Sequence, residues 1–153
     1  MIIIEKGKRR LTLERDGQAL FSCSVNLGNM PEGPKTTEGD GRTPEGEYFI
    51  CTVNRASKFF ISLGISYPSP ADAKGGLKRS EIGFFDYLLI RLAALFRLRP
   101  KWTSPLGGFV MIHGESPDGK TGDWTQGCVA LSNADIKTLS ALTGKGEKVR
   151  ILP

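Results

Sequence analysis

Apolar and polar residues alternate along the first 28 residues of the chain, a pattern typical of strands that bury one face. The alternating segments are "IIIEK" (2–6), "RRLTLERD" (9–16) and "QALFSCSVNLG" (18–28), and the Asp16–Gly17 pair between the last two is a strong hairpin signal. Later apolar runs predict further strands in "GEYFICTV" (46–53), "KFFISLGISYP" (58–68), "GGFVMIHG" (107–114), "GCVALS" (127–132) and "EKVRILP" (147–153). The pattern therefore predicts many short strands joined by turns, in keeping with the 19 glycines.

Three other segments depart from this pattern. Residues 29–45, "NMPEGPKTTEGDGRTPE", predict a long loop, and loops of this length are usually functional or disordered. "SNADIKTLSAL" (132–142) has the cap and apolar spacing of a helix that Gly144 closes. Residues 80–102, "SEIGFFDYLLIRLAALFRLRPKW", predict a second helix that Pro100 ends.

The helix predicted over 80–102 has two interpretations that the sequence leaves open. At 100° per residue one wide face collects the large apolar side chains Phe84, Phe85, Leu88, Leu89, Leu92, Leu95 and Phe96. This face suits packing against a sheet. It also suits an interfacial helix on an anionic membrane, because cations flank it at Lys78, Arg79, Arg91, Arg97, Arg99 and Lys101.

Size and charge narrow the classes of function. The 153 residues fit a single domain. The net charge of +5 favours an anionic partner such as a membrane surface, a cell-wall polymer or nucleic acid. We do not expect nucleic-acid binding, because no basic stripe with interleaved aromatic residues is present.

No apolar run approaches the roughly twenty residues of a spanning helix. The apolar run in "MIIIEKGKRR" (1–10) is too short for the apolar region of a signal peptide. We therefore expect a cytosolic chain or one without its export segment.

The candidate chemistry lies in "MIHGESPDGKTGDWTQGCVALSN" (111–133), which holds the only histidine, His113, and the thiol of Cys128. An imidazole can hold a thiol as thiolate and then protonate a leaving amine. Gly114 allows a turn after the histidine, and Gly127 lets peptide N–H groups beside Cys128 approach a substrate carbonyl as an oxyanion hole. The alternative is a buried cysteine and an unrelated, hydrogen-bonded histidine. One histidine and one nearby cysteine cannot fill a zinc shell, so no metal site is predicted.

The other two cysteines, Cys23 and Cys51, lie in strand-like segments. Each is interpreted as a small buried side chain, or the two form one disulfide that leaves Cys128 free.

The order His-Gly, a loop, then Thr-x-Gly-Cys resembles the catalytic motif of the L,D-transpeptidase (YkuD-type) family of peptidoglycan enzymes. "EGDGRTPEGEYFI" (38–50) and "SKFFISLGISYPSPAD" (57–72) look like segments of its Gram-negative branch, and the resemblance covers most of residues 25–142. It implies a mainly β, sandwich- or barrel-like catalytic domain over 1–153, with a short C-terminal helix and an inserted amphipathic helix at about 78–104. It also implies a periplasmic or cell-envelope location, and no cofactor or metal.

Carried over by position, the resemblance makes Cys128 the nucleophile and His113 its base, with the carbonyl of Gly114 orienting the imidazole. It places substrate contacts at Arg42, Trp124, Thr125, Gln126 and Gly127. The guanidinium of Arg42 suits a carboxylate, or Arg42 is a structural residue of the loop. Trp124 lines the cleft or anchors its loop. Two positions depart from many family members, which have His in place of Gln126 and Arg or Asn in place of Ala130. Gln126 can hydrogen-bond a substrate but carries no charge. These departures leave the substrate and the fate of the acyl-enzyme open.

Three functions follow as hypotheses. The first is cysteine acyl transfer on peptidoglycan stem peptides, in which an amine resolves the thioester to form a cross-link or attach a lipoprotein. The second is an L,D-type hydrolase that removes cross-links or lipoprotein, because "GCVALSN" is similar to a branch that includes such an enzyme. The third is a non-catalytic module that binds the wall or a membrane surface through residues 80–102.

Overall fold

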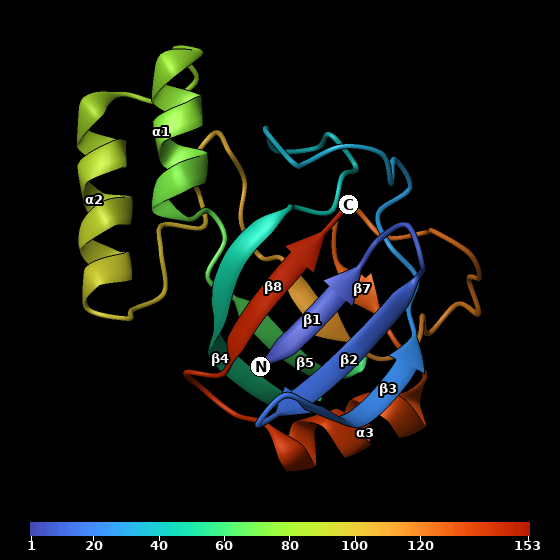
Figure 1. The fold of residues 1–153 in the computed structure, drawn as a ribbon. Coiled ribbons are helices and arrows are strands. Elements are labelled where there is room, and N and C mark those ends of the chain that lie inside the picture. The colour runs from blue at the N-terminus through green and yellow to red at the C-terminus, as the bar shows by residue number, and fades with distance from the viewer.

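The protein is described over all of residues 1–153 by a computed structural model, and its main element is one curled eight-stranded sheet (Figure 1). The strand order is β3-β2-β1-β8-β4-β5-β6-β7. The strands are β1 (Ile2–Glu5), β2 (Arg10–Arg15), β3 (Gln18–Ser24), β4 (Gly46–Ser57), β5 (Phe60–Ile65), β6 (Met111–His113), β7 (Val129–Ala130) and β8 (Lys148–Leu152). Each lies within or near a segment where the sequence predicts a strand, and the mainly β fold is confirmed.

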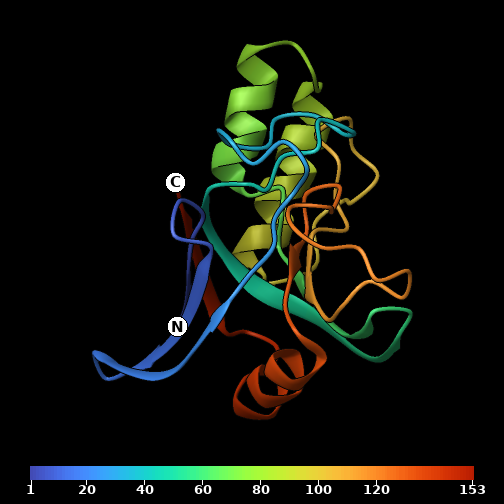
Figure 2. The ribbon, with the colours of Figure 1, turned by 90° about the vertical axis from the view of Figure 1, so that its right-hand side faces the viewer.

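The sheet curls because strand β4 belongs to both of its halves. The first part of β4 pairs with β8 from Gly46 to Phe49, and its later part pairs with β5. The register shifts twice along β4, after Ile50 and after Asn54. Such bulges bend a strand and increase its twist, so β4 turns one half of the sheet across the other, as the view in Figure 2 shows.

Two isolated bridges, Asn26 with Ala130 and Gly28 with Thr125, nearly close this sheet into a barrel. Asn26, just after β3, exchanges two backbone hydrogen bonds with Ala130 of β7, both 2.8 Å long. The apolar side chains of the curled sheet point inward and form the main core, in which Ile2 and Ile4 from one half meet Leu63 and Ile112 from the other. The sheet is therefore barrel-like, and β6 and β7 lie where its two edges meet.

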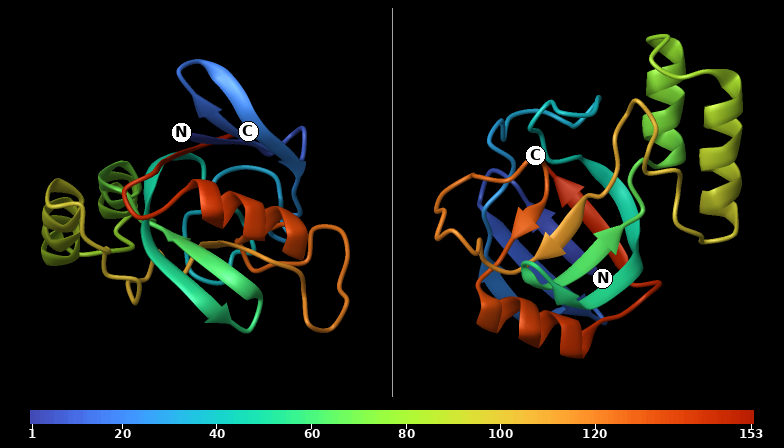
Figure 3. Two further views of the ribbon diagram at one scale, coloured as in Figure 1. Left: turned by 90° about the horizontal axis from the view of Figure 1, so that it is seen from below. Right: turned by 180° about the vertical axis from the view of Figure 1, so that it is seen from behind.

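Helix α3 (Asn133–Leu142) covers one end of the curled sheet, as the view from below shows (Figure 3). Ser132 caps the helix by accepting the N–H of Asp135, and Ile136 and Leu139 are buried in the main core. The sequence predicts this helix with nearly the same bounds. It follows β7 directly, so it fixes the direction in which the chain leaves Cys128.

Two further helices form a hairpin beside the sheet (Figure 1). Helix α1 (Pro70–Lys78) has no counterpart among the predicted helices, although Ser69 and Asp72 form a capping box at its start. Helix α2 (Phe84–Leu95) is shorter than the helix predicted over 80–102. It ends at Phe96, where Arg97 adopts a left-handed φ of 54°, and so before Pro100.

The hairpin has a small core of its own. Ala73, Ile82, Ile90 and Leu106 are its buried members, and Ile90 is the only fully buried residue of α2. The apolar face that the sequence identifies on this helix is mostly exposed and does not pack on the sheet. None of the three helices combines the length and apolar character that crossing a membrane requires.

Candidate active site

Strands β6 and β7 bring the predicted catalytic pair to one face of the sheet. The two strands run parallel, with Ile112 opposite Val129 and His113 opposite Ala130, and Cys128 directly precedes β7. Side chains of consecutive strand residues point to opposite faces. Ile112 and Val129 point into the main core, so the side chains of His113 and Cys128 both lie on the other face.

The imidazole of His113 is held on two sides. Its Nδ1 lies 2.7 Å from the carbonyl oxygen of Gly114. A carbonyl can only accept, so Nδ1 carries the proton and Nε2 keeps its lone pair. The ring stacks on Phe59, with centroids 4.3 Å apart, and Trp124 meets its edge at 5.6 Å. Burial lowers the pKa of His113, and the charge of Lys58 lowers it further, against the hydrogen bond to Gly114. A neutral imidazole is therefore favoured.

The sulfur of Cys128 is turned toward backbone atoms of residues 109–111. The N–H of Met111 donates to Sγ at 3.4 Å, and the thiol lies 3.6 Å from the carbonyl oxygen of Phe109. No hydrogen bond joins the sulfur to His113. Burial raises the pKa of the Cys128 thiol, outweighing the N–H of Met111 and the positive charge of Lys35. The structure therefore holds a neutral thiol beside a neutral imidazole, not the imidazole-stabilised thiolate that the sequence suggests.

Thr125 shapes the turn that presents Cys128. Its Oγ1 accepts the N–H of Gly127 at 3.1 Å and donates to the carbonyl oxygen of Cys128 at 2.7 Å. The N–H of Gly127 is thus already bonded within the turn. The N–H of Cys128 itself makes no hydrogen bond, so it is a free donor beside the sulfur.

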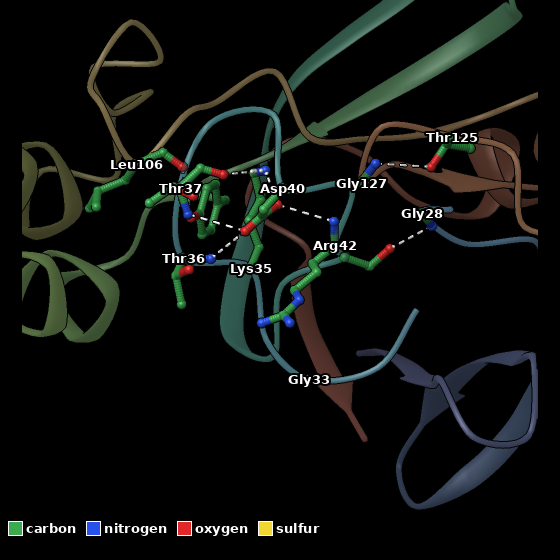
Figure 4. A network of polar contacts seen from close by, with 12 residues as sticks. Gly28, Gly33, Lys35, Thr36, Thr37, Asp40, Arg42, Leu106, Thr125 and Gly127 are labelled. Carbon is green, nitrogen blue, oxygen red and sulfur yellow. Dashed lines mark hydrogen bonds and ion pairs between the residues drawn. The ribbon is translucent and has the colours of Figure 1, made fainter. Parts of the chain in front are cut away.

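The long loop 29–45 lies against this turn through backbone atoms (Figure 4). The carbonyl oxygen of Arg42 would lie 2.5 Å from a Cβ atom built on Gly127, and Gly127 has a φ of +122°. The guanidinium of Arg42 has no ion-pair or hydrogen-bond partner, and Figure 4 shows its side chain directed toward Gly33, away from Gly127. The loop therefore contributes the Arg42 backbone to the turn, while the predicted carboxylate-binding group points elsewhere.

Lys35 is a cation at this site that the sequence analysis does not select. Its buried Nζ pairs with Asp40 at 2.8 Å and donates to the carbonyl oxygen of Thr37. Although burial raises the pKa of Asp40, hydrogen bonds from Lys35 and from backbone N–H groups lower it more, so the carboxylate stays charged. The Lys35 stem passes 3.9 Å from a Cβ built on Gly127. A buried lysine in a loop has no sequence pattern, so only the folded structure identifies it.

The remaining predicted contacts lie around the pair. Trp124 is half-buried against His113, whereas Gln126 is exposed. Ala130, at one of the two positions that depart from the family pattern, is buried where the sheet edges meet, and its methyl group supplies no charge there. Phe59 was also missed, because the neighbouring "FF" at 59 and 60 does not show which ring faces inward.

The two other thiols lie outside this site. Cys23 and Cys51 are both free, so the disulfide alternative is not formed. Burial raises the pKa of Cys23 to about 12 and that of Cys51 to about 11. Both are neutral thiols, and Cys23 packs against the main core.

Two cavities lie near these elements, and neither is lined by His113 or Cys128. One of about 380 Å³ lies on the far side of Trp124, between the loop 115–121, Asn26 and the start of α3. The larger, about 480 Å³, lies between α2 and the paired strands β4 and β8. No cluster of three or more histidine, cysteine or carboxylate residues could hold a metal ion.

Comparison with known proteins identifies the family of this chain and solved structures with a similar fold. The family model for the L,D-transpeptidase catalytic domain, YkuD, matches residues 1–151. No curated protein matches the sequence.

Solved structures that resemble this chain include Pgp2 of Campylobacter jejuni, a helical cell shape determining protein. It is 22% identical with a TM-score of 0.68, and the match covers 98% of this chain and 46% of Pgp2. Bd1075 of Bdellovibrio bacteriovorus is 23% identical with a TM-score of 0.63, over 99% of this chain and 47% of Bd1075. L,D-transpeptidase 3 of Mycobacterium tuberculosis, in complex with a faropenem-derived adduct, is 13% identical with a TM-score of 0.56. The match covers 99% of this chain and 59% of that protein. This chain spans about half the length of these proteins, and the likeness establishes the fold.

Proposed function

The chain belongs to the L,D-transpeptidase catalytic domain family, and from this premise we propose that it is a cysteine acyl-transfer enzyme acting on peptidoglycan stem peptides in the cell envelope. The observation that carries the proposal is the shared face of His113 and Cys128 on β6 and at the start of β7, with Nδ1 of His113 fixed on Gly114 and Nε2 unprotonated. A neutral imidazole of lowered pKa is suited to accept a thiol proton when substrate is bound.

The reaction begins with proton transfer from the Cys128 thiol to Nε2 of His113. The thiolate attacks the carbonyl carbon of the L,D bond between meso-diaminopimelate and D-alanine, and the N–H of Cys128 donates to the oxyanion. The C–N bond breaks, the imidazolium returns its proton to the departing D-alanine amine, and a thioester on Cys128 remains. An amine of a second stem peptide then attacks the thioester, restoring the thiol and forming a 3–3 cross-link, or a lipoprotein amine does so.

The charge and aromatic groups at the site support this assignment. Lys35 places a fixed positive charge beside the turn of Cys128, which favours the thiolate once the proton has left. Phe59 and Trp124 pack against the imidazole and hold its ring in place. The proposed role extends to cell shape, by the likeness to Pgp2, because cross-links set the mechanical properties of the wall.

Mass spectrometry of muropeptides after incubation with the protein tests the proposal. Cross-linked dimers that have lost D-alanine are expected from transpeptidation. Conversion of tetrapeptides to tripeptides plus free D-alanine would instead assign water as the acceptor and make the protein an L,D-type hydrolase. Unchanged muropeptides with folded protein would contradict both activities. A Cys51→Ala variant should react like the wild type, since that thiol lies outside the site.

A further inference from the structure

Helix α2 carries a wide apolar face that no part of the chain covers. The exposed fractions of its six large outer side chains range from 39% to 73%, for Phe84, Phe85, Leu88, Leu92, Leu95 and Phe96. At 100° per residue these positions fall within about a third of the helix circumference. Soluble proteins rarely leave a contiguous apolar surface of this kind in water, so the face indicates a partner.

The hairpin presents this face outward. Ile90, on the opposite side of α2, is buried in the small hairpin core, and Tyr87 packs against the same cluster. Between the hairpin and the paired strands β4 and β8 lies the cavity of about 480 Å³. Figures 1 and 3 show α1 and α2 standing beside the sheet, with the loop 115–124 on the other side of the molecule. A partner on α2 would therefore leave the loop next to Trp124 open.

The segment that carries the apolar face is rich in positive charge. Residues 78–101 contain two carboxylates, and both are already paired: Glu81 with Arg79 at 2.7 Å and Asp86 with Lys101 at 2.8 Å. The segment contains six cations, all exposed: Lys78, Arg79, Arg91, Arg97, Arg99 and Lys101. Four of these six have no carboxylate partner, so the segment carries an excess of positive charge; of the four, Arg97 lies over the ring of Phe49 and Arg99 over that of Trp102.

We propose that the α1–α2 hairpin docks on an anionic lipid bilayer, with the axis of α2 in the plane of the membrane. The phenylalanine and leucine side chains would enter the boundary between headgroups and acyl chains, and the long stem of Arg91 lets its guanidinium group reach lipid phosphates. Arg97 and Arg99, which follow α2 and lie over Phe49 and Trp102, are exposed and add to the positive charge that attracts the anionic surface. A second copy of the chain is a poorer occupant, because pairing two such faces brings their unpaired cations together.

Sedimentation with lipid vesicles tests the proposal. The wild type is expected to pellet with phosphatidylglycerol-containing vesicles at least tenfold more than with pure phosphatidylcholine vesicles. A triple variant, Leu88→Ser, Leu92→Ser and Leu95→Ser, should lose at least tenfold of this binding and keep its fold, because all three side chains are exposed. The matched control replaces the exposed leucines Leu20, Leu142 and Leu152, which lie outside the hairpin, with Ser and should bind like the wild type.

A charge variant separates the two contributions. Arg91→Gln, Arg97→Gln and Arg99→Gln keep the apolar face, so binding to anionic vesicles should fall to the level seen with neutral ones. The Leu88→Trp variant keeps an apolar side chain on the face and adds a fluorescent probe there. The fluorescence of this tryptophan should be quenched by brominated lipids only when anionic vesicles are present. Circular dichroism checks the fold of each variant, and if the triple serine variant is misfolded, the Leu88→Trp result decides.

Several results would overturn the proposal. These are wild-type protein that stays in the supernatant with anionic vesicles, a triple serine variant that binds as well as the wild type, or an unquenched Trp at position 88. A dimer in solution that the triple serine variant converts to a monomer, without vesicle binding, would assign the face to a second copy. Cleavage of small soluble peptides should be equal in all these variants, so membrane docking and the proposed chemistry succeed or fail separately.

Discussion

A Cβ atom on Gly127 would lie 2.5 Å from the carbonyl oxygen of Arg42, so the turn that presents Cys128 and the long loop 29–45 touch backbone to backbone. The two segments are about 85 residues apart in sequence. Gly127 also has a φ of +122°, in the region that residues with a Cβ rarely adopt. The position of Cys128 therefore depends on a residue without a side chain.

Replacing Gly127 with Ala should destabilise the protein by about 2 kcal/mol or more and reduce turnover, because the new methyl group must displace the loop or the turn. Gly119→Ala is the matched control: Gly119 also has a positive φ, +67°, but a Cβ there meets nothing within 4 Å. It should cost about 1 kcal/mol from backbone strain alone. Urea unfolding and turnover measure both effects. Equal losses in the two variants would mean that the contact with Arg42 has no influence.

Cys128→Ala should lower turnover at least about 10³-fold, because it removes the proposed nucleophile. The circular dichroism spectrum should stay the same, because alanine fits in the space of the cysteine side chain. Faropenem offers an independent probe, since acylation adds one adduct mass to the reactive thiol. The wild type and Cys51→Ala should each gain one adduct, and Cys128→Ala none. An adduct on Cys23 or Cys51 would show that the nucleophile is misassigned.

Phe59→Leu should move the acid limb of the pH–rate profile to higher pH. Burial lowers the pKa of His113, partly through the ring of Phe59 stacked on it at 4.3 Å. Admitting water favours the imidazolium, so its pKa rises toward the ordinary value of about 6.5 and the neutral base is lost earlier on acidification. Phe60→Leu, at the exposed neighbouring ring, should leave the acid limb in place.

The same shift has a consequence for stability. The pKa of His113 is lower in the folded protein than in the unfolded chain. Its contribution to the free energy of unfolding is therefore fully present above about pH 6.5 and is lost as the pH falls through the pKa of the folded protein. This acid-dependent loss should be smaller in Phe59→Leu. An unchanged acid limb together with an unchanged stability profile would contradict the role given to Phe59.

Lys35→Met should cost about 3 kcal/mol of unfolding free energy, because it leaves the Asp40 carboxylate charged and largely buried without its partner. Lys101→Met is the matched control at an exposed ion pair with Asp86 and should cost about 0.5 kcal/mol or less. Lys35→Met should also raise the pH at which Cys128 reacts with an alkylating reagent. Equal stability losses in the two variants would contradict a special role for the buried pair.

The sequence by itself identified most strands, helix α3 and the residues that bear chemistry. Alternation along residues 2–28 is a local property, and strands with one buried face express it directly. His113 and Cys128 could be selected because the chain has a single histidine and places it near a glycine-flanked cysteine. The sequence also identified the apolar face of α2, although not where that helix ends.

Only the tertiary structure decided how these residues meet. The parallel register of β6 and β7 sets which face His113 and Cys128 share, and a shift of one residue would separate them. The direction of the Arg42 side chain, the burial of Lys35 and the choice of Phe59 over Phe60 depend on contacts between distant segments, which carry no periodic signal. Whether the α2 face is covered is likewise a matter of packing, since an apolar stripe looks the same in sequence whether it meets a sheet or solvent.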